Sequence, residues 1–153
     1  MFKVNIIVEE PKWKKEMPTI EKILKKNFKK IFSFISRTSK KKNLEISVLL
    51  TNKTKIKKLN KAFRKTPKDT DILSFPQYEK IFFLKKKVAT INKVYLGDLA
   101  FSYDYIKKQK TNFVEYVNKI FIHGCLHLVG YEHDNLKSYK EMRSLERKLL
   151  AII

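Results

Sequence analysis

The segment from residue 112 to residue 133 constrains the fold of this chain more than any other stretch. Apolar side chains lie on nearly every face of the later half of its helix, which we expect to reach about Val129. A helix that is apolar all round is buried in the middle of a domain. Gly130 then provides a helix stop, because glycine adopts the left-handed conformation that closes a C-terminus. The sequence therefore predicts a central helix around which the other elements pack.

All three histidines of the chain lie at the end of this segment, at positions 123, 127 and 133. His123 and His127 are four residues apart, so they project from one face of the helix. His133 follows Gly130 by three residues, which span at most about 10 Å, so its ring can turn back towards the other two. Three neutral imidazoles with an open fourth position are typical of catalytic zinc. We therefore predict a metal site on these side chains.

Two neighbouring residues narrow the chemistry of this predicted site. Cys125, the only cysteine, lies two residues from each helical histidine and points to another side of the helix. We interpret it as a small buried hydrophobe. The spacing of the histidines also occurs in zinc proteases, whose catalytic glutamate follows the first histidine. Gly124 stands at that position and cannot accept a proton, which argues against peptide hydrolysis.

The charge of the chain indicates a polyanionic partner. Lysine and arginine together number 35, against 15 aspartates and glutamates, and the formal net charge is +20. Such an excess suits nucleic acid. The competing explanation is a lysine-rich composition imposed by an AT-rich genome, so the charge supports RNA binding without defining a site.

Length and composition bound the class of protein. A chain of 153 residues fits one domain with a single modest core, residues 1–153. One cysteine excludes an internal disulfide and fits a reducing cytosol. The N-terminus lacks the apolar region of a signal peptide, and no apolar run approaches the roughly 18 residues of a membrane span.

Apolar periodicity predicts strands and helices along the rest of the chain. We expect strands at 2–8, 44–50 and 94–101, and a short strand after the loop that begins near residue 63. We expect helices at 19–36, 52–65, 104–110, 112–129 and 135–151. In the last helix the side chains expected to face inward are Leu136, Tyr139, Met142, Leu145 and Leu149.

Arg64 is the most informative cation outside the histidine segment. The chain has only four arginines against 31 lysines, so an arginine suggests a need for bidentate contact with phosphate or carboxylate. The alternative is a structural ion pair with Asp69 or Asp71. Asp98 follows the third glycine, Gly97, and either orients a histidine or is an ordinary carboxylate at a strand end. Gly97 itself predicts a bulge or a close backbone approach.

Three blocks of this sequence, dense between residues 59 and 134, resemble the YbeY family of bacterial endoribonucleases. Residues 123–133 reproduce its signature His-Gly-x-Leu-His-Leu-x-Gly-Tyr-Asp-His except at Glu132, where the family usually has aspartate. Residues 60–76 resemble a second block, in which Arg64 falls on a functionally important arginine. Residues 96–99 resemble a third block.

The resemblance implies an α+β fold: a single domain with a small mixed four-stranded sheet, about five helices and a central buried metal-binding helix. It implies one zinc ion on His123, His127 and His133, with Arg64 as the catalytic residue. The implied activity is metal-dependent, single-strand-specific cleavage of RNA in 16S rRNA 3′-end processing, ribosome maturation and ribosome quality control. The implied partners are ribosomal RNA and the small ribosomal subunit in the cytoplasm, without DNA or membrane.

Two other functions stay open from the sequence. One is a non-catalytic RNA-binding ribosome assembly factor that zinc only stabilises. The other is a metallopeptidase-like hydrolase. The sequence assigns no general base and no role to Glu132, and it leaves the basic segment 77–93 either as a guide for RNA or as a solvated face.

Overall fold

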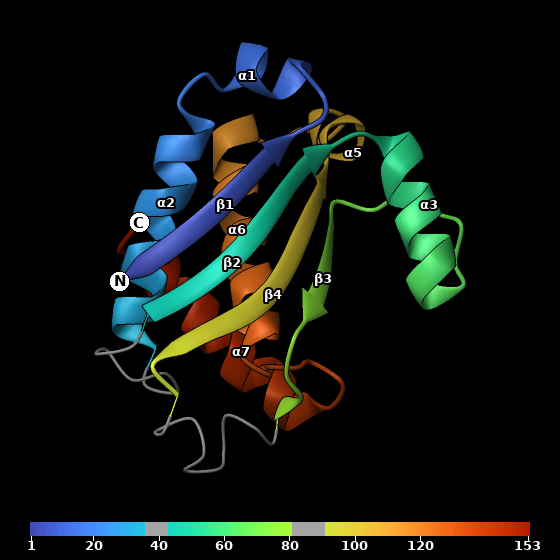
Figure 1. Ribbon diagram of the computed structural model, residues 1–153. Coiled ribbons are helices and arrows are strands. Elements are labelled where there is room, and N and C mark those ends of the chain that lie inside the picture. The colour runs from blue at the N-terminus through green and yellow to red at the C-terminus, as the bar shows by residue number, and fades with distance from the viewer. Residues whose placement is uncertain (36–42, 81–90) are drawn as a thin grey trace.

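The computed structural model of the protein describes residues 1–35, 43–80 and 91–153, and these form one four-stranded sheet with helices on both faces (Figure 1). The strand order is β1-β2-β4-β3. β1, β2 and β4 are mutually parallel, and β3 is antiparallel to β4. The sheet is therefore mixed, as expected. The strands are β1 (Phe2–Val8), β2 (Asn43–Thr51), β3 (Ile72–Pro76) and β4 (Lys93–Ser102).

Six helices lie within the described ranges, one more than expected. They are α1 (Lys12–Glu16), α2 (Ile20–Phe34), α3 (Lys53–Arg64), α5 (Tyr103–Lys107), α6 (Phe113–Leu128) and α7 (Leu136–Leu150). α1 was not predicted because its five residues are too few to show a helical period. Asparagines begin three of the longer helices: the side chains of Asn52, Asn112 and Asn135 each accept a hydrogen bond from a first-turn backbone N–H, which satisfies one unpaired donor.

The main hydrophobic core lies between the sheet and the layer formed by α2, α6 and α7, whereas α3 stands on the other side, beside β3 (Figure 1). α6 is the central helix that the sequence predicted, and Val117, Phe121 and Cys125 on it are fully buried. Parallel neighbours such as β1 and β2 need a long crossover connection, which α1 and α2 provide.

Trp13 belongs to this core. Its side chain is fully buried, packs edge-on against Phe101 and Tyr103, and donates a hydrogen bond from Nε1 to the carbonyl of Thr51 at 2.9 Å. No helix in the described residues is both long and apolar enough to cross a membrane.

Gly97 sits where the sheet is irregular. The pairing of β2 with β4 shifts register between Glu45 and Ile46, and Gly97 has a φ of +135°. A Cβ at this position would collide with the backbone carbonyl of Phe75 on β3. The predicted close backbone approach is confirmed. Of the basic segment 77–93, residues 81–90 lie outside the described ranges.

Candidate metal centre

Two histidines lie in the C-terminal half of α6, where this helix packs against β3 and β4 at one edge of the sheet. His123 and His127 are one helical turn apart, and their ring centroids lie 4.5 Å from each other. Gly124 lets α6 approach the sheet here: an added Cβ would come within 2.6 Å of the Ile72 side chain and 2.9 Å of the Leu99 side chain. The glycine thus permits close packing, which places the two histidines on a helix that lies directly against the sheet.

The chain reversal after α6 brings the third histidine to the same place. Gly130 has a φ of +88°, and its N–H bonds to the carbonyl of His127 at 3.0 Å while the Tyr131 N–H bonds to that of Leu126 at 3.1 Å. These two bonds close the helix with a Schellman motif. The ring of His133 consequently lies 5.4 Å from that of His123 and 5.1 Å from that of His127. The three side chains each offer a nitrogen, all within 4.8 Å of one another.

The hydrogen bonds of the rings decide which nitrogens are free. His127 Nδ1 lies 2.9 Å from the carbonyl oxygen of Tyr131, which can only accept, so this Nδ1 carries a proton. His123 Nδ1 lies 2.6 Å from the Glu146 carboxylate and likewise donates. In the neutral rings both Nε2 atoms are then bare lone pairs, and they face each other at 3.0 Å. Two facing lone pairs repel each other, and a metal ion or a proton between them removes the repulsion.

This geometry fits a divalent metal ion. Two nitrogens at a Zn–N distance of about 2.0–2.1 Å in a tetrahedral site are separated by about 3.3 Å, close to the 3.0 Å between the two Nε2 atoms. The donor set of three imidazoles suits zinc and other transition metals. His123, His127 and His133 are the residues that would hold the ion, and His133 is the most exposed of them.

The protonation behaviour of the site favours ligation at neutral pH. Burial, together with the neighbouring His123, lowers the pKa of His127 to about 4, so this ring is neutral and available as a ligand. Burial alone would raise the pKa of Glu146, but the hydrogen bond from His123 and the nearby positive charges outweigh it and hold that pKa below its usual value. Glu146 is therefore a carboxylate able to orient His123.

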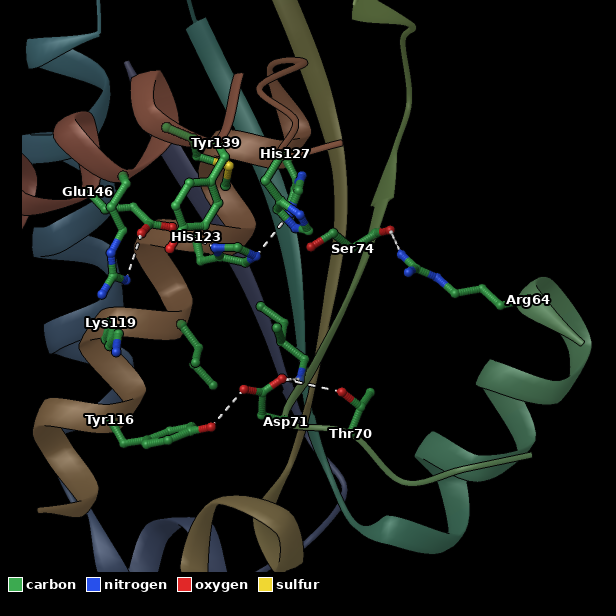
Figure 2. Close-up of a pocket in the computed structure, with 15 residues that line it drawn as sticks. Arg64, Thr70, Asp71, Ser74, Tyr116, Lys119, His123, His127, Tyr139 and Glu146 are labelled. Carbon is green, nitrogen blue, oxygen red and sulfur yellow. Dashed lines mark hydrogen bonds and ion pairs between the residues drawn. The ribbon is translucent and has the colours of Figure 1, made fainter. Parts of the chain in front are cut away.

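The histidines lie in an open cleft of about 490 Å³ between α6, α7, β3 and the end of α3 (Figure 2). Arg64 reaches into the cleft from α3 and donates a hydrogen bond from Nη2 to the carbonyl of Ser74 at 3.3 Å. Lys119 and Arg143 line the same cleft from α6 and α7. The site thus combines a candidate metal centre with cations of three different helices, an arrangement suited to an anionic substrate.

The structure brings the four predicted site residues, Arg64 and the three histidines, into this one cleft. The alternative pairing of Arg64 with Asp69 or Asp71 is wrong for the described residues, where the guanidinium contacts a backbone carbonyl instead.

Two carboxylates left open by the sequence fall outside the cleft. Asp98 accepts a hydrogen bond from the Tyr95 hydroxyl at 2.5 Å and does not line the cleft, so it orients no histidine. Glu132 is exposed and is also absent from the cleft lining. Cys125 is fully buried, and burial raises the pKa of its thiol well above the usual value, which agrees with its interpretation as a hydrophobe.

Sequence reasoning missed Glu146 as the partner of His123. It assigned Leu136 and Tyr139 to the inner face of the last helix, but these side chains are 70% and 50% exposed, whereas Met142, Glu146 and Leu149 are buried. The available signal was the spacing: Glu146 follows Met142 by four residues and precedes Leu149 by three, so it shares their face. A carboxylate on the apolar stripe of a helix marks a site of interest.

Fold and site together define a class: small α+β proteins that carry a three-histidine metal-type centre in a cation-lined cleft. The family model described as endoribonuclease YbeY matches residues 9–153. A protein named endoribonuclease YbeY from Pelagibacter ubique (strain HTCC1062) is 40% identical over 149 residues, which cover 93% of this chain and 90% of the relative. The chain belongs to the YbeY endoribonuclease family.

A solved structure shows the same fold. The solution structure of TM1509 from Thermotoga maritima matches 96% of this chain and 86% of its own chain, with a TM-score of 0.57 and 24% sequence identity. The expected α+β class and the family resemblance are both confirmed.

Proposed function

We propose that this protein is a metal-dependent, single-strand-specific endoribonuclease, formed by residues 1–153 as one domain. His123, His127 and His133 hold one zinc ion, and Arg64 is the catalytic residue that binds the phosphate. Its substrate is ribosomal RNA, cleaved during 16S rRNA 3′-end processing, and its wider roles are small-subunit maturation and ribosome quality control in the cytoplasm. Membership of a family named for endoribonuclease activity supports the reaction class.

The observation that carries the metal dependence is the pair of facing Nε2 atoms, 3.0 Å apart. Both Nδ1 atoms are committed to acceptors, so the fold has oriented two lone pairs towards one point. A bound divalent ion supplies Lewis-acid chemistry there, by lowering the pKa of water or polarising a phosphoryl oxygen. The acceptors on the far side of the rings keep each ligand in the correct tautomer.

Arg64 completes the site from the opposite wall of the cleft. Its guanidinium donates one hydrogen bond, to the carbonyl of Ser74, among the described residues. Its other N–H groups can therefore contact phosphate oxygens in the bidentate geometry that arginine favours. The developing negative charge on the phosphoryl group gives such a donor its catalytic value. Lys119 and Arg143 lie along the same cleft and are placed to contact neighbouring phosphates.

The two rival functions are less well supported by the geometry. A peptidase glutamate at position 124 would need space that the Ile72 and Leu99 side chains fill. A metallopeptidase mechanism would therefore lack the general base that this position supplies in zinc proteases. A purely structural zinc needs a fourth protein ligand. In the described part of the chain, the only group of histidine, cysteine or carboxylate side chains placed to hold a metal contains three ligands. Catalysis is therefore favoured over a stabilising role.

The decisive experiment compares single-stranded and duplex RNA as substrates for the zinc-loaded protein, with and without chelator. We expect cleavage of the single strand only, lost on chelation and restored by zinc. Arg64→Ala should retain metal and lose activity by about a hundredfold, the usual effect of removing one transition-state donor. The matched control is Arg147→Ala, because Arg147 is exposed on α7 and does not line the cleft.

His127→Ala separates the metal mechanism from contamination by another nuclease. It should abolish both metal binding and cleavage. A His127→Ala protein that binds no zinc yet cleaves RNA at the wild-type rate refutes the metal mechanism. Loss of metal from Arg64→Ala would instead make Arg64 a structural residue.

A further inference from the structure

Asp71, immediately before β3, is a carboxylate of the cleft that contacts no histidine. Its Oδ1 accepts hydrogen bonds from the Ile72 N–H at 2.7 Å and the Thr70 hydroxyl at 3.3 Å. Its Oδ2 accepts the Tyr116 hydroxyl of α6 at 2.8 Å. Figure 2 shows this group on the cleft wall below His123. The carboxylate is thus fixed in position from both sides of the cleft.

The donors on Asp71 are all neutral. Within the described residues, no lysine or arginine forms an ion pair with Asp71. An ionised carboxylate offers about four lone-pair directions. Donors from the described part of the chain occupy three of them, which leaves one on Oδ2. A phosphate would be repelled here, so the group of an RNA strand that suits the remaining direction is a neutral donor, a hydroxyl or an N–H.

Tyr116 fixes the sense of the hydrogen bond. Burial, followed by the hydrogen bond to Asp71, raises the pKa of the Tyr116 phenol, so the hydroxyl stays protonated and donates. Tyr116 precedes His123 by seven residues on α6, which corresponds to about 10 Å along the helix. The Asp71–Tyr116 pair therefore lies in the same cleft as the histidines but about two helical turns away from His123 along α6.

We propose that Asp71, oriented by Tyr116, accepts a hydrogen bond from the ribose 2′-hydroxyl of a nucleotide next to the cleavage site and thereby selects RNA over DNA. This inference rests on the proposed function of the cleft. The 2′-hydroxyl is a neutral donor that DNA lacks. An N–H group of a nucleobase has the same donor chemistry, but it would produce a preference for particular bases in place of a preference for ribose.

A purely structural role for Asp71 makes a different prediction. The hydrogen bond to Tyr116 also ties β3 to α6, and its loss would lower stability without changing the preference between RNA and DNA. The ratio of the two affinities therefore separates recognition from structure.

The test measures fluorescence anisotropy of labelled oligouridine and oligodeoxyuridine, which carry the same base. The zinc-loaded protein carries Arg64→Ala throughout, since this background should keep the metal without cleaving the RNA strand, and "wild type" here refers to position 71. Asp71→Asn should reduce the preference for RNA by about tenfold or more, the effect of one hydrogen bond to a charged group. Asp98→Asn is the matched control, because Asp98 also accepts a tyrosine hydroxyl but lies outside the cleft. It should retain the wild-type preference.

Two further measurements test the same contact independently. Oligouridine with one 2′-deoxy position at a time should weaken wild-type binding at one position and have no effect there in Asp71→Asn. Tyr116→Phe, which leaves the carboxylate in place, should lower the RNA preference to a smaller extent and serves if Asp71→Asn does not fold. Folded variants that keep the wild-type preference overturn the inference.

Oligonucleotides of other bases and a cleavage assay separate this inference from base recognition and from the proposed function. Oligocytidine and oligoadenylate should show the same Asp71-dependent preference for ribose as oligouridine. An Asp71 effect that follows the base and ignores the sugar also overturns the inference. An Asp71-dependent preference for RNA, without RNA cleavage when Arg64 is intact, defeats the proposed function alone. Cleavage with an Asp71-independent preference defeats this inference alone.

Discussion

Glu146→Ala is expected to weaken zinc binding strongly, although Glu146 offers the metal no ligand atom in the three-histidine group. The carboxylate lies 2.6 Å from His123 Nδ1, and its side chain is only 10% exposed. It holds the ring in the tautomer that presents Nε2 to the metal. Removal of such a partner typically costs 10–100-fold in metal affinity. Glu146→Ala should lie near the upper end of this range, because it leaves the buried Nδ1–H of His123 without an acceptor.

Glu146→Gln should have a smaller effect. The amide oxygen still accepts from Nδ1–H, so the tautomer survives, but the negative charge that increases the basicity of the ring is lost. We expect about a tenfold weaker affinity for Gln and about a hundredfold for Ala, which correspond to about 1.4 and 2.7 kcal/mol.

The assay is competition for zinc with a chromophoric chelator at neutral pH. Glu141→Gln is the matched control, because Glu141 lies on α7 but does not line the cleft. Nitrogen NMR of the histidine rings in the metal-free protein should also show His123 protonated on Nδ1 in the wild type. If Glu146→Ala binds zinc as tightly as the wild type, the argument from the oriented ring is refuted.

Three further perturbations test the geometry around the centre. Gly130→Ala should destabilise the protein by about 1–2 kcal/mol, because its φ of +88° is left-handed and the new Cβ would come within 2.8 Å of Lys80; an unchanged melting temperature contradicts this. Gly124→Ala should cost about 1–3 kcal/mol through overpacking against Ile72, measured by urea denaturation, and a gain in stability would mean that the helix propensity of alanine outweighs the clash. The metal-free protein should lose stability between about pH 6.5 and pH 4, because the pKa of His127 falls from 6.5 in the unfolded chain to about 4 in the fold and the unfolded state therefore binds more protons. Unfolding free energies measured across this range should depend less on pH in His127→Gln, and an equal dependence in both proteins would count against the assigned cause.

Most secondary structure could be predicted from local pattern, because the long elements bury one regular face. The helix expected at 112–129 is α6, and the strand expected at 94–101 is β4, each within about two residues. The three histidines of the metal site could be predicted for a related reason. His123 and His127 share a helical face, and Gly130 determines where the chain turns, so their proximity follows from local geometry.

The remaining features of the cleft depend on contacts between distant segments. Asp71 and Tyr116 are 45 residues apart, and only the packing of α6 on β3 brings them together. Glu146 contacts His123 across 23 residues. Its burial cannot be recognised in the sequence, because most of its neighbours on α7 are charged as well. Apolar periodicity reports which face is inward for hydrophobic side chains, but it does not report a buried carboxylate.

The central claim is that three imidazoles bind one metal ion that RNA cleavage requires. The most direct measurement is elemental analysis of the purified protein after removal of free metal, with cleavage of single-stranded RNA assayed on the same samples. We predict one ion per wild-type chain together with cleavage, and neither in His127→Ala. Wild-type protein that cleaves the strand while free of metal would contradict the account.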